Sequence, residues 1–311
     1  MLNEQIAAAV GPSRLDIAYE QRGDPAHPTV LLVMGLAAQL VHWPIGLIDA
    51  LVERGLHVVR FDNRDAGRST HLRDAPPADL PAALRGDLSA AAYTLSDMAG
   101  DAVGLLGALK IDAAHVVGAS MGGAIAQTMA IEYRARVRSL TSMMSTTGDS
   151  KVGQIHPATM KSVFGGAPAH TREQVVARAV RVHAIVGSPA FPTDPAVVAE
   201  VAGQAHDRDH DEPAIVRQAV ATVASGDRTR LLHKLDVPTL VLHGLADTMC
   251  DPGGGRATAA AIPGAELVLV EGMGHNLPPG LWPRIADLIA AVVQRGEARA
   301  RHADGGSITD A

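Results

Sequence analysis

Cysteine and aromatic residues are scarce in this chain of 311 residues. Cys250 is the only cysteine, which excludes an internal disulfide and a multi-cysteine zinc site. No turn typical of a nucleophile surrounds Cys250, so we interpret it as a small apolar packing residue. Phenylalanine, tyrosine and tryptophan make up only 3% of the residues, which leaves few side chains for a lipid-docking patch.

Long apolar runs and an excess of positive charge are also missing. No uninterrupted apolar run reaches the roughly 20 residues of a membrane-spanning helix. The N-terminus lacks the cationic segment and apolar stretch of a secretory signal, so we expect a cytoplasmic protein without a membrane partner. The formal net charge of −6 comes without a basic stripe, which argues against nucleic acid as a partner. We therefore expect the partner to be a small molecule.

The apolar residues that are present indicate a large core. They make up 47% of the chain, enough for one large domain or one domain with an insertion. Runs rich in Val, Leu and Ile predict buried strands at 29–34, 56–61, 113–117, 137–143, 238–243 and 265–270. Helical patterns alternate with them at 44–54, 95–109 and 124–133, which predicts an α/β fold with a doubly wound, mostly parallel sheet. Residues 14–20 alternate polar and apolar, so we expect an antiparallel edge strand there.

The alternation of strand and helix stops between 148 and 235. Helical patterns follow one another there, at 171–186, 195–207 and 213–224, separated by turns with Pro and Gly. We interpret 148–235 as a helical cap inserted over the carboxyl ends of the strands, and 1–147 with 236–293 as the core. Residues 294–311 lack a periodic apolar face, and we expect them to form a disordered tail.

The most informative motif is Gly118-Ala119-Ser120-Met121-Gly122, which lies between a predicted strand and a predicted helix. This G-x-S-x-G pattern is typical of a nucleophile elbow. The turn strains the serine backbone and exposes its hydroxyl, and the two glycines let strand and helix approach closely. We predict that Ser120 is a catalytic nucleophile rather than an ordinary turn serine.

A serine hydroxyl needs a base and a third group that orients the base. In enzymes with this elbow the chain order is Ser, then Asp or Glu, then His. Asp247 in His-Gly-x-x-Asp and His275 in Gly-Met-Gly-His each follow a predicted strand, so we predict them as acid and base. Asp251 is the serious rival for the acid, whereas Asp236 precedes its strand. His243 and His115 are interpreted as structural.

Acyl transfer also needs backbone N–H groups that stabilise the oxyanion. The N–H of Met121, directly after the serine, is one predicted donor. The second is expected in the loop after the first parallel strand, with Leu36 as the best candidate. An ordinary strand-end turn at Met34-Gly35 is the alternative.

Other polar clusters receive structural interpretations. We expect Asp62, Arg64 and Asp65 to brace their loop through ion pairs. Residues 206–212 carry several metal-type donors but lack H-E-x-x-H spacing, so we expect a solvated charged loop and no metal site. The three glycines at 253–255 do not form a phosphate-binding loop, because G-x-x-x-x-G-K-[ST] is absent.

Taken together, the motifs resemble those of an α/β-hydrolase of the esterase type, and within it the aclacinomycin methylesterase-like group. The matching segments are MGL (34–36), FDNRDAGRS (61–69), GASMGG (118–123), ASGDR (224–228), HGLAD (243–247) and GMGH (272–275). The resemblance implies Ser120, Asp247 and His275 as the triad, with Leu36 and Met121 as oxyanion donors. The chain departs from the group at two places. Cys250-Asp251 stands where apolar residues are common, and Asn276 stands where Asp is common.

We therefore predict a serine hydrolase that cleaves small to medium soluble carboxylic esters through an acyl-serine intermediate, without a cofactor. A cofactor-free perhydrolase, lactonase or hydroxynitrile lyase of the same fold would use the same triad. A non-catalytic ligand-binding protein of this fold is the alternative outside enzymes.

Overall fold

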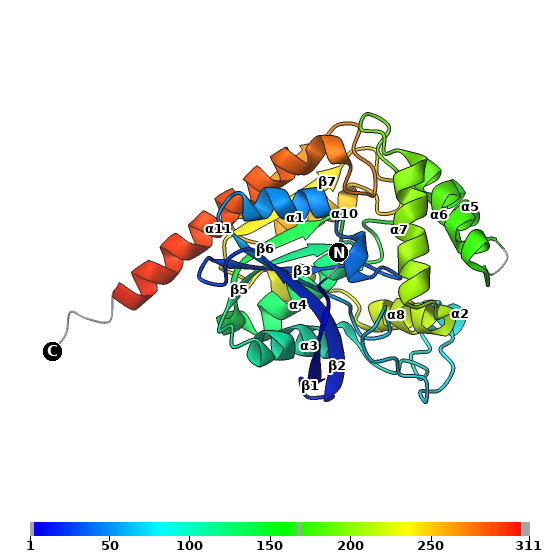
Figure 1. Cartoon of the computed structure of the whole chain (residues 1–311), viewed down its shortest axis with the longest axis horizontal. Coiled ribbons are helices and arrows are strands. Elements are labelled where there is room, and N and C mark those ends of the chain that lie inside the picture. The colour runs from blue at the N-terminus through cyan, green and yellow to red at the C-terminus, as the bar shows by residue number, and fades with distance from the viewer. Residues whose placement is uncertain (1–2, 167–168, 306–311) are drawn as a thin grey trace.

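The computed structural model describes residues 3–166 and 169–305, and in them an eight-stranded sheet lies between two layers of helices (Figure 1). The strands are β1 (Gln5–Val10), β2 (Leu15–Arg22), β3 (Thr29–Val33), β4 (His57–Phe61), β5 (Ala114–Ala119), β6 (Val137–Met143), β7 (Thr239–Gly244) and β8 (Glu266–Val270). Their order is β1-β2-β4-β3-β5-β6-β7-β8. The pairs β1/β2 and β2/β4 are antiparallel and the others are parallel, which confirms the predicted sheet.

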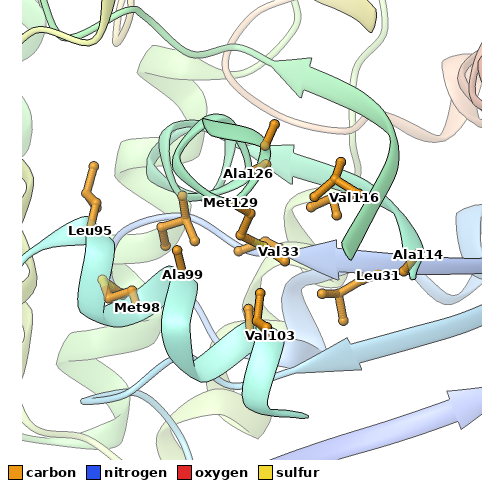
Figure 2. Packing of buried hydrophobic residues seen from close by; sticks show 14 of the residues in the cluster. Leu31, Val33, Leu95, Met98, Ala99, Val103, Ala114, Val116, Ala126 and Met129 are labelled. Atoms are coloured by element: carbon orange, nitrogen blue, oxygen red, sulfur yellow. The ribbon is translucent and has the colours of Figure 1, made fainter. Parts of the chain in front are cut away.

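Helices cover both faces of the sheet. The helices α1 (Ile45–Val52) and α11 (Trp282–Gly305) pack on one face, and α3 (Leu95–Ala108), α4 (Met121–Glu132) and α10 (Gly253–Ala261) on the other. Successive residues of a strand point to opposite faces, so Leu31 and Val33 join the core against α3 and α4 (Figure 2), whereas Val30 and Leu32 join the core against α1 and α11. Both faces of β3 are therefore buried, which explains its continuous apolar run.

One sheet edge differs from the prediction. Residues 14–20 do form an antiparallel strand, but β2 lies between β1 and β4, so β1 is the edge. The sequence did not predict β1 because Ile6 is followed by three alanines, which favour helix over strand. The pairing of β1 with β2 is irregular between Ala7 and Val10, where Ala9 has a positive φ of 52°.

The predicted disordered tail is wrong for 294–305, because α11 continues to Gly305 (Figure 1). Alanine, arginine and glutamate are good helix formers and sustain the helix beyond its apolar face. Glu297 also ties the extension to the sheet, since its Oε1 accepts a hydrogen bond from Arg138 (2.6 Å) and lies 3.2 Å from His115 Nε2. Residues 306–311 lie outside the described residues.

His115 on β5, which contacts α11, makes the stability of the fold depend on pH. Burial lowers the pKa of His115 to about 4, below the roughly 6.5 of an exposed histidine in the unfolded chain. Between these values the unfolded chain binds the extra proton, so the His115 contribution is complete above pH 6.5 and is lost as the pH falls toward 4. We expect the melting temperature to fall less between pH 7 and pH 4.5 in His115→Gln than in the wild type. Parallel melting curves for the two proteins across this range would contradict the prediction.

The segment between β6 and β7 is helical, as predicted. It contains α5 (Pro157–Phe164), α6 (Arg172–Val186), α7 (Pro195–Arg208), α8 (Glu212–Ala224) and α9 (Thr229–Leu232). In Figure 1, α5 to α8 lie together beside one end of the sheet, and α8 contacts α2 (Leu80–Leu84) of the core. The division into core and cap remains our interpretation.

Three short 3-10 helices complete the described elements: η1 (Leu40–His42), η2 (Arg134–Arg136) and η3 (Pro279–Leu281). Across 3–166 and 169–305, no helix combines the length and the apolar character that crossing a membrane requires.

The strand order places a topological switch point between β3 and β5. The chain leaves β3 toward β4 on one side, whereas β5 pairs with β3 on the other. The loop after β3 leads to α1 and the turn after β5 leads to α4, and these helices lie on opposite faces, so the chain leaves the carboxyl ends of the two strands in opposite directions. Ligands of doubly wound sheets bind at such a switch point.

Candidate active site

Ser120 lies at the carboxyl end of β5, on the turn into α4. Its backbone has φ 57° and ψ −122°, a conformation that costs an L-residue about 1–3 kcal/mol and persists only where the surroundings enforce it. Two close approaches enforce it here, because a Cβ at Gly118 would lie 2.1 Å from the Gly122 carbonyl oxygen and one at Gly122 would lie 2.0 Å from that of Val33. Only glycine fits at both positions, so the motif forms the predicted elbow.

His275 follows β8 and reaches the serine. Its Nε2 lies 3.0 Å from Ser120 Oγ. The loop around it is held by the end of α6, where the Val186 carbonyl accepts the His275 N–H at 2.7 Å and Ser188 Oγ accepts the Gly274 N–H at 2.9 Å. A Cβ at Gly274 would lie 2.3 Å from the Gly187 carbonyl oxygen, which explains the glycine directly before the histidine.

Asp247 follows β7 and holds the other side of the imidazole. Its Oδ2 lies 2.7 Å from His275 Nδ1, and its Oδ1 accepts the N–H groups of Met249 and Cys250, both at 2.9 Å. Burial disfavours the carboxylate, but hydrogen bonds from His243 and His275 outweigh it and lower the pKa of Asp247 to about 2. Asp247 is therefore ionised throughout the neutral range and can orient an imidazole.

His243 helps to hold Asp247 in place, which the sequence did not indicate. It is fully buried, its Nε2 lies 2.8 Å from the Cys250 carbonyl oxygen, and it lies 3.4 Å from Asp247 Oδ2. The imidazole therefore braces the 247–250 turn and the carboxylate together. Burial raises the pKa of the neighbouring Cys250 thiol, with Asp247 and Asp251 adding to the shift, so the thiol stays protonated as expected of a packing residue.

The two rival acids lie elsewhere. Asp251 is exposed and its Oδ1 accepts the Gly253 N–H at 2.8 Å, at the start of α10. Asp236 precedes β7 and forms ion pairs with Arg134 and Arg299. The geometry therefore brings Asp247, and neither rival, to His275.

This contrast predicts the outcome of two substitutions. Asp247→Asn keeps the size of the side chain but removes the charge that orients His275, so we expect kcat to fall by about 10⁴. Asp251→Asn alters an exposed turn and should leave kcat within about 3-fold of the wild type. Steady-state assays on one ester measure both, and the reverse ranking would assign the acid to Asp251.

The loop after β3 lies beside Ser120. A Cβ at Gly35 would lie 3.0 Å from Ser120 Cβ and 3.6 Å from the Met121 nitrogen, so the start of this loop and the start of α4 adjoin. Leu36 comes next in the loop and is partly buried against the core. The N–H of Met121 belongs to the first turn of α4, where backbone N–H groups lack partners within the helix.

The predicted bracing role of the polar residues after β4 is confirmed. The Arg64 guanidinium donates to Asp101 at 2.6 and 2.8 Å. The Asp65 carboxylate accepts from Arg217 at 2.7 and 2.8 Å and from Tyr93 Oη at 2.8 Å. These ion pairs join the loop after β4 to α3 and α8.

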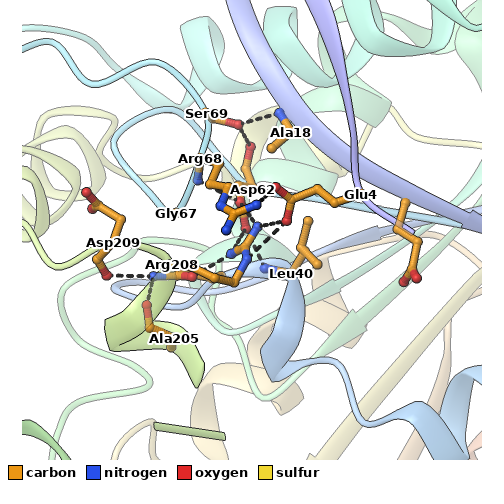
Figure 3. Close-up of polar contacts among 12 residues, drawn as sticks. Glu4, Ala18, Leu40, Asp62, Gly67, Arg68, Ser69, Ala205, Arg208 and Asp209 are labelled. Carbon is orange, nitrogen blue, oxygen red and sulfur yellow. Dashed lines mark hydrogen bonds and ion pairs between the residues drawn. The ribbon is translucent and has the colours of Figure 1, made fainter. Parts of the chain in front are cut away.

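The predicted solvated loop at 206–212 is wrong. Residues 206–208 belong to α7, and the side chain of Arg208 is only 7% exposed, with its guanidinium on Asp62 at 2.7 Å and on Glu4 (Figure 3). Asp209 and Asp211 face His71 at 3.3 and 3.1 Å. Within the part of the chain that the structure describes, no group of three or more His, Cys, Asp or Glu side chains is placed to hold a metal ion.

The arrangement as a whole is suited to proton transfer from a hydroxyl. The imidazole lies within hydrogen-bond distance of Ser120 Oγ on one side and of an ionised carboxylate on the other. A hydroxyl that loses its proton in this way is a nucleophile for a carbonyl carbon.

Comparison with known proteins places the chain among relatives. Residues 28–278 match the family model of the alpha/beta hydrolase fold. The rhodomycin D methylesterase DnrP of Streptomyces peucetius is 29% identical over 292 residues, which cover 88% of this chain and 93% of that protein. The rhodomycin D methylesterase DauP of Streptomyces sp. (strain C5) is 29% identical over 289 residues, covering 86% and 92%. The structure of a thermophilic esterase from Thermogutta terrifontis is 24% identical with a TM-score of 0.67, covering 95% of this chain and 99% of that one.

Proposed function

The chain belongs to the α/β hydrolase fold family, and from this premise we propose that it is a serine hydrolase that cleaves small to medium soluble carboxylic esters. The observation that carries the proposal is the hydrogen-bonded chain from Asp247 through His275 to Ser120, with the serine on a strained elbow. The similarity to two methylesterases over most of the chain supports the ester bond as the target.

The first half-reaction acylates the serine. Ser120 Oγ attacks the ester carbonyl while His275 Nε2 accepts its proton, and Asp247 stabilises the imidazolium that forms. The N–H groups of Leu36 and Met121 donate to the oxyanion, where one such donor contributes about 2.7–4 kcal/mol. His275 then protonates the leaving alcohol, which departs.

The second half-reaction releases the acid. A water molecule gives a proton to His275 and attacks the acyl carbonyl, the same two N–H groups stabilise the second oxyanion, and Ser120 leaves with the proton returned. No step needs a redox partner or a metal, so we propose that the enzyme works without a cofactor.

The proposal predicts a preference for short esters. The few aromatic residues of the chain offer little surface for docking on lipid, and the helical segment 148–235 is proposed to enclose the substrate. We expect efficient cleavage of p-nitrophenyl esters from acetyl to about hexanoyl, weak action on emulsified triolein, no increase in rate at an oil–water interface, and no effect of EDTA.

The chain-length series, with methyl esters, triolein and chelator in parallel, tests this preference. Maximal activity on triolein would contradict an enclosed site. Loss of activity with EDTA would contradict metal-free hydrolysis. Release of one equivalent of p-nitrophenol without turnover would contradict the hydrolase and favour a ligand-binding protein.

We further propose that the enzyme acts in the cytoplasm on a dissolved small molecule, without nucleic acid as a partner. The charge balance and the lack of a basic stripe argue against nucleic acid as a partner. Recovery of the esterase activity in the cytosolic fraction of lysed cells tests it, and recovery in the membrane fraction would contradict it.

A further inference from the structure

The loop after β3 adopts a conformation that its own sequence does not favour. Ala37, next to the proposed oxyanion donor Leu36, has a positive φ of 61°, which is costly for a residue with a Cβ. Within the loop, the Ala38 N–H donates to the Gly35 carbonyl at 3.3 Å, which is long for such a bond. Contacts from outside the loop must therefore hold it.

One of these contacts comes from α8, in the segment between β6 and β7. Gln218 is fully buried, its Oε1 accepts the Ala37 N–H at 3.1 Å, and its Nε2 donates to the Arg64 carbonyl at 2.8 Å. The opposite orientation of the amide would face an N–H with an NH₂ group and a carbonyl with a carbonyl. The two partners thus fix the amide, and the amide fixes the loop after β3 relative to the loop after β4.

The second contact comes from the end of α7. Gln39, at the far end of the loop, donates through Nε2 to the carbonyl oxygens of Ala205 and Asp209, at 2.9 and 3.0 Å. Its Oε1 accepts from Arg208, which also pairs with Asp62 (Figure 3). Asp62 in turn accepts the Leu40 N–H at 2.6 Å, directly after the loop.

We propose that Gln218 and Gln39 are positioning residues that make the helical segment 148–235 set the geometry of the oxyanion hole. The proposal rests on the proposed function. Because Leu36 lies between the end of β3 and Ala37, where the first contact holds the chain, and has no regular structure of its own, the direction of its N–H follows the position of α7 and α8. The segment 148–235 then affects the stabilisation of the oxyanion as well as the access of substrate.

The test is a pair of isosteric substitutions, Gln218→Met and Gln39→Met, each of which removes the amide hydrogen bonds and keeps the side-chain volume. Complete loss of one oxyanion donor lowers kcat by about 10²–10³. A donor that is only misplaced should cost less, so we expect kcat/KM for p-nitrophenyl acetate to fall on the order of 10-fold to 100-fold. The affinity for a trifluoromethyl ketone, whose adduct places an oxyanion in the hole, should fall by the same factor. The affinity for an unreactive amide analogue should change less than 2-fold.

Gln127→Met is the matched control. Gln127, on α4, is also fully buried and also hydrogen-bonds through both ends of its amide, but its partners are Ser142 at 3.1 Å and Arg228 at 3.3 Å rather than the loop after β3. We expect this variant to lose stability but to keep kcat/KM within about 3-fold. An equal loss of kcat/KM in the control would overturn the proposal, because the effect would then be general destabilisation.

Hydrogen exchange provides a measurement that needs no activity. The backbone amides of 36–39 should exchange faster in Gln218→Met and Gln39→Met than in the wild type. Their exchange rates should be unchanged in Gln127→Met. Unchanged exchange together with wild-type kcat/KM, or an equal loss of affinity for the ketone and the amide analogue, would overturn the proposal. Failure of the wild-type enzyme to cleave any ester would refute the proposed function instead, and the exchange rates would still decide whether the two glutamines hold the loop.

Discussion

Ser120→Ala is expected to abolish ester cleavage, with kcat lowered on the order of 10⁶ and the melting temperature within a few degrees of the wild type. The substitution removes one oxygen atom, which in the proposed mechanism is the atom that forms the covalent bond to the acyl group. The backbone is not expected to change, because the close contacts of Gly118 and Gly122 enforce the turn and alanine carries the same Cβ as serine. Steady-state assays with p-nitrophenyl acetate and thermal unfolding measure the two quantities.

A matched control is Ser145→Ala, which removes the hydroxyl of another buried serine near α4 that belongs to no part of the proposed machinery. Near wild-type turnover in Ser120→Ala would refute the covalent mechanism. A large fall in melting temperature in that variant alone would show that the serine supports the fold rather than the chemistry.

His275→Ala should be as damaging as Ser120→Ala, and the double variant only slightly worse than either. In the proposed mechanism the imidazole removes the proton from the hydroxyl at 3.0 Å. Without the imidazole the hydroxyl is a poor nucleophile, and without the hydroxyl the base has no proton to accept. Residues that act as one unit are strongly non-additive. Comparing ln kcat for the two single variants and the double variant measures the coupling.

Additive losses in this cycle would contradict the assignment, since they would mean that His275 and Ser120 act independently. A mild effect of His275→Ala alone would show that another base serves the serine. Addition of imidazole to His275→Ala provides a second check, because a small base that enters the vacated space should restore part of the activity.

The strands that position the site were predictable because the sequence of each strand is enough to show that it is buried. β3, β5 and β7 are buried along their whole length, so each is a run of apolar residues that needs no knowledge of distant partners. β1 was not, because its alanines carry no strand preference and its pairing with β2 decides its conformation. The extension of α11 was missed for the same reason, since Glu297 finds its partners on β5 and β6.

The candidate triad was predictable because each member lies in a short motif directly after a strand. The glycines around Ser120 and before His275 are needed for close backbone approaches, and such glycines are visible in a sequence. The contacts that hold the loop after β3 were not predictable. Gln218 and Ala37 are 181 residues apart, and Arg208 and Asp62 are 146 apart, so no local pattern relates them.

A charged residue without a visible partner is expected in solvent, which is why Arg208 was placed in a solvated loop. Its burial depends on Asp62 and Glu4, which the fold brings to it from the core. His243 is a similar case, since its contact with Asp247 arises only when the 247–250 turn folds back on β7.

The measurement that tests the central claim most directly is the mass of the enzyme during turnover. Rapid acid quenching of a reaction with p-nitrophenyl acetate, followed by proteolysis and mass spectrometry, should find an acetyl group on the peptide that contains Ser120, at up to one equivalent per enzyme. The group should disappear when substrate is exhausted, and it should be absent in Ser120→Ala. Turnover without any acetylated peptide, or with the acetyl group on another residue, would contradict an acyl-serine mechanism at this site.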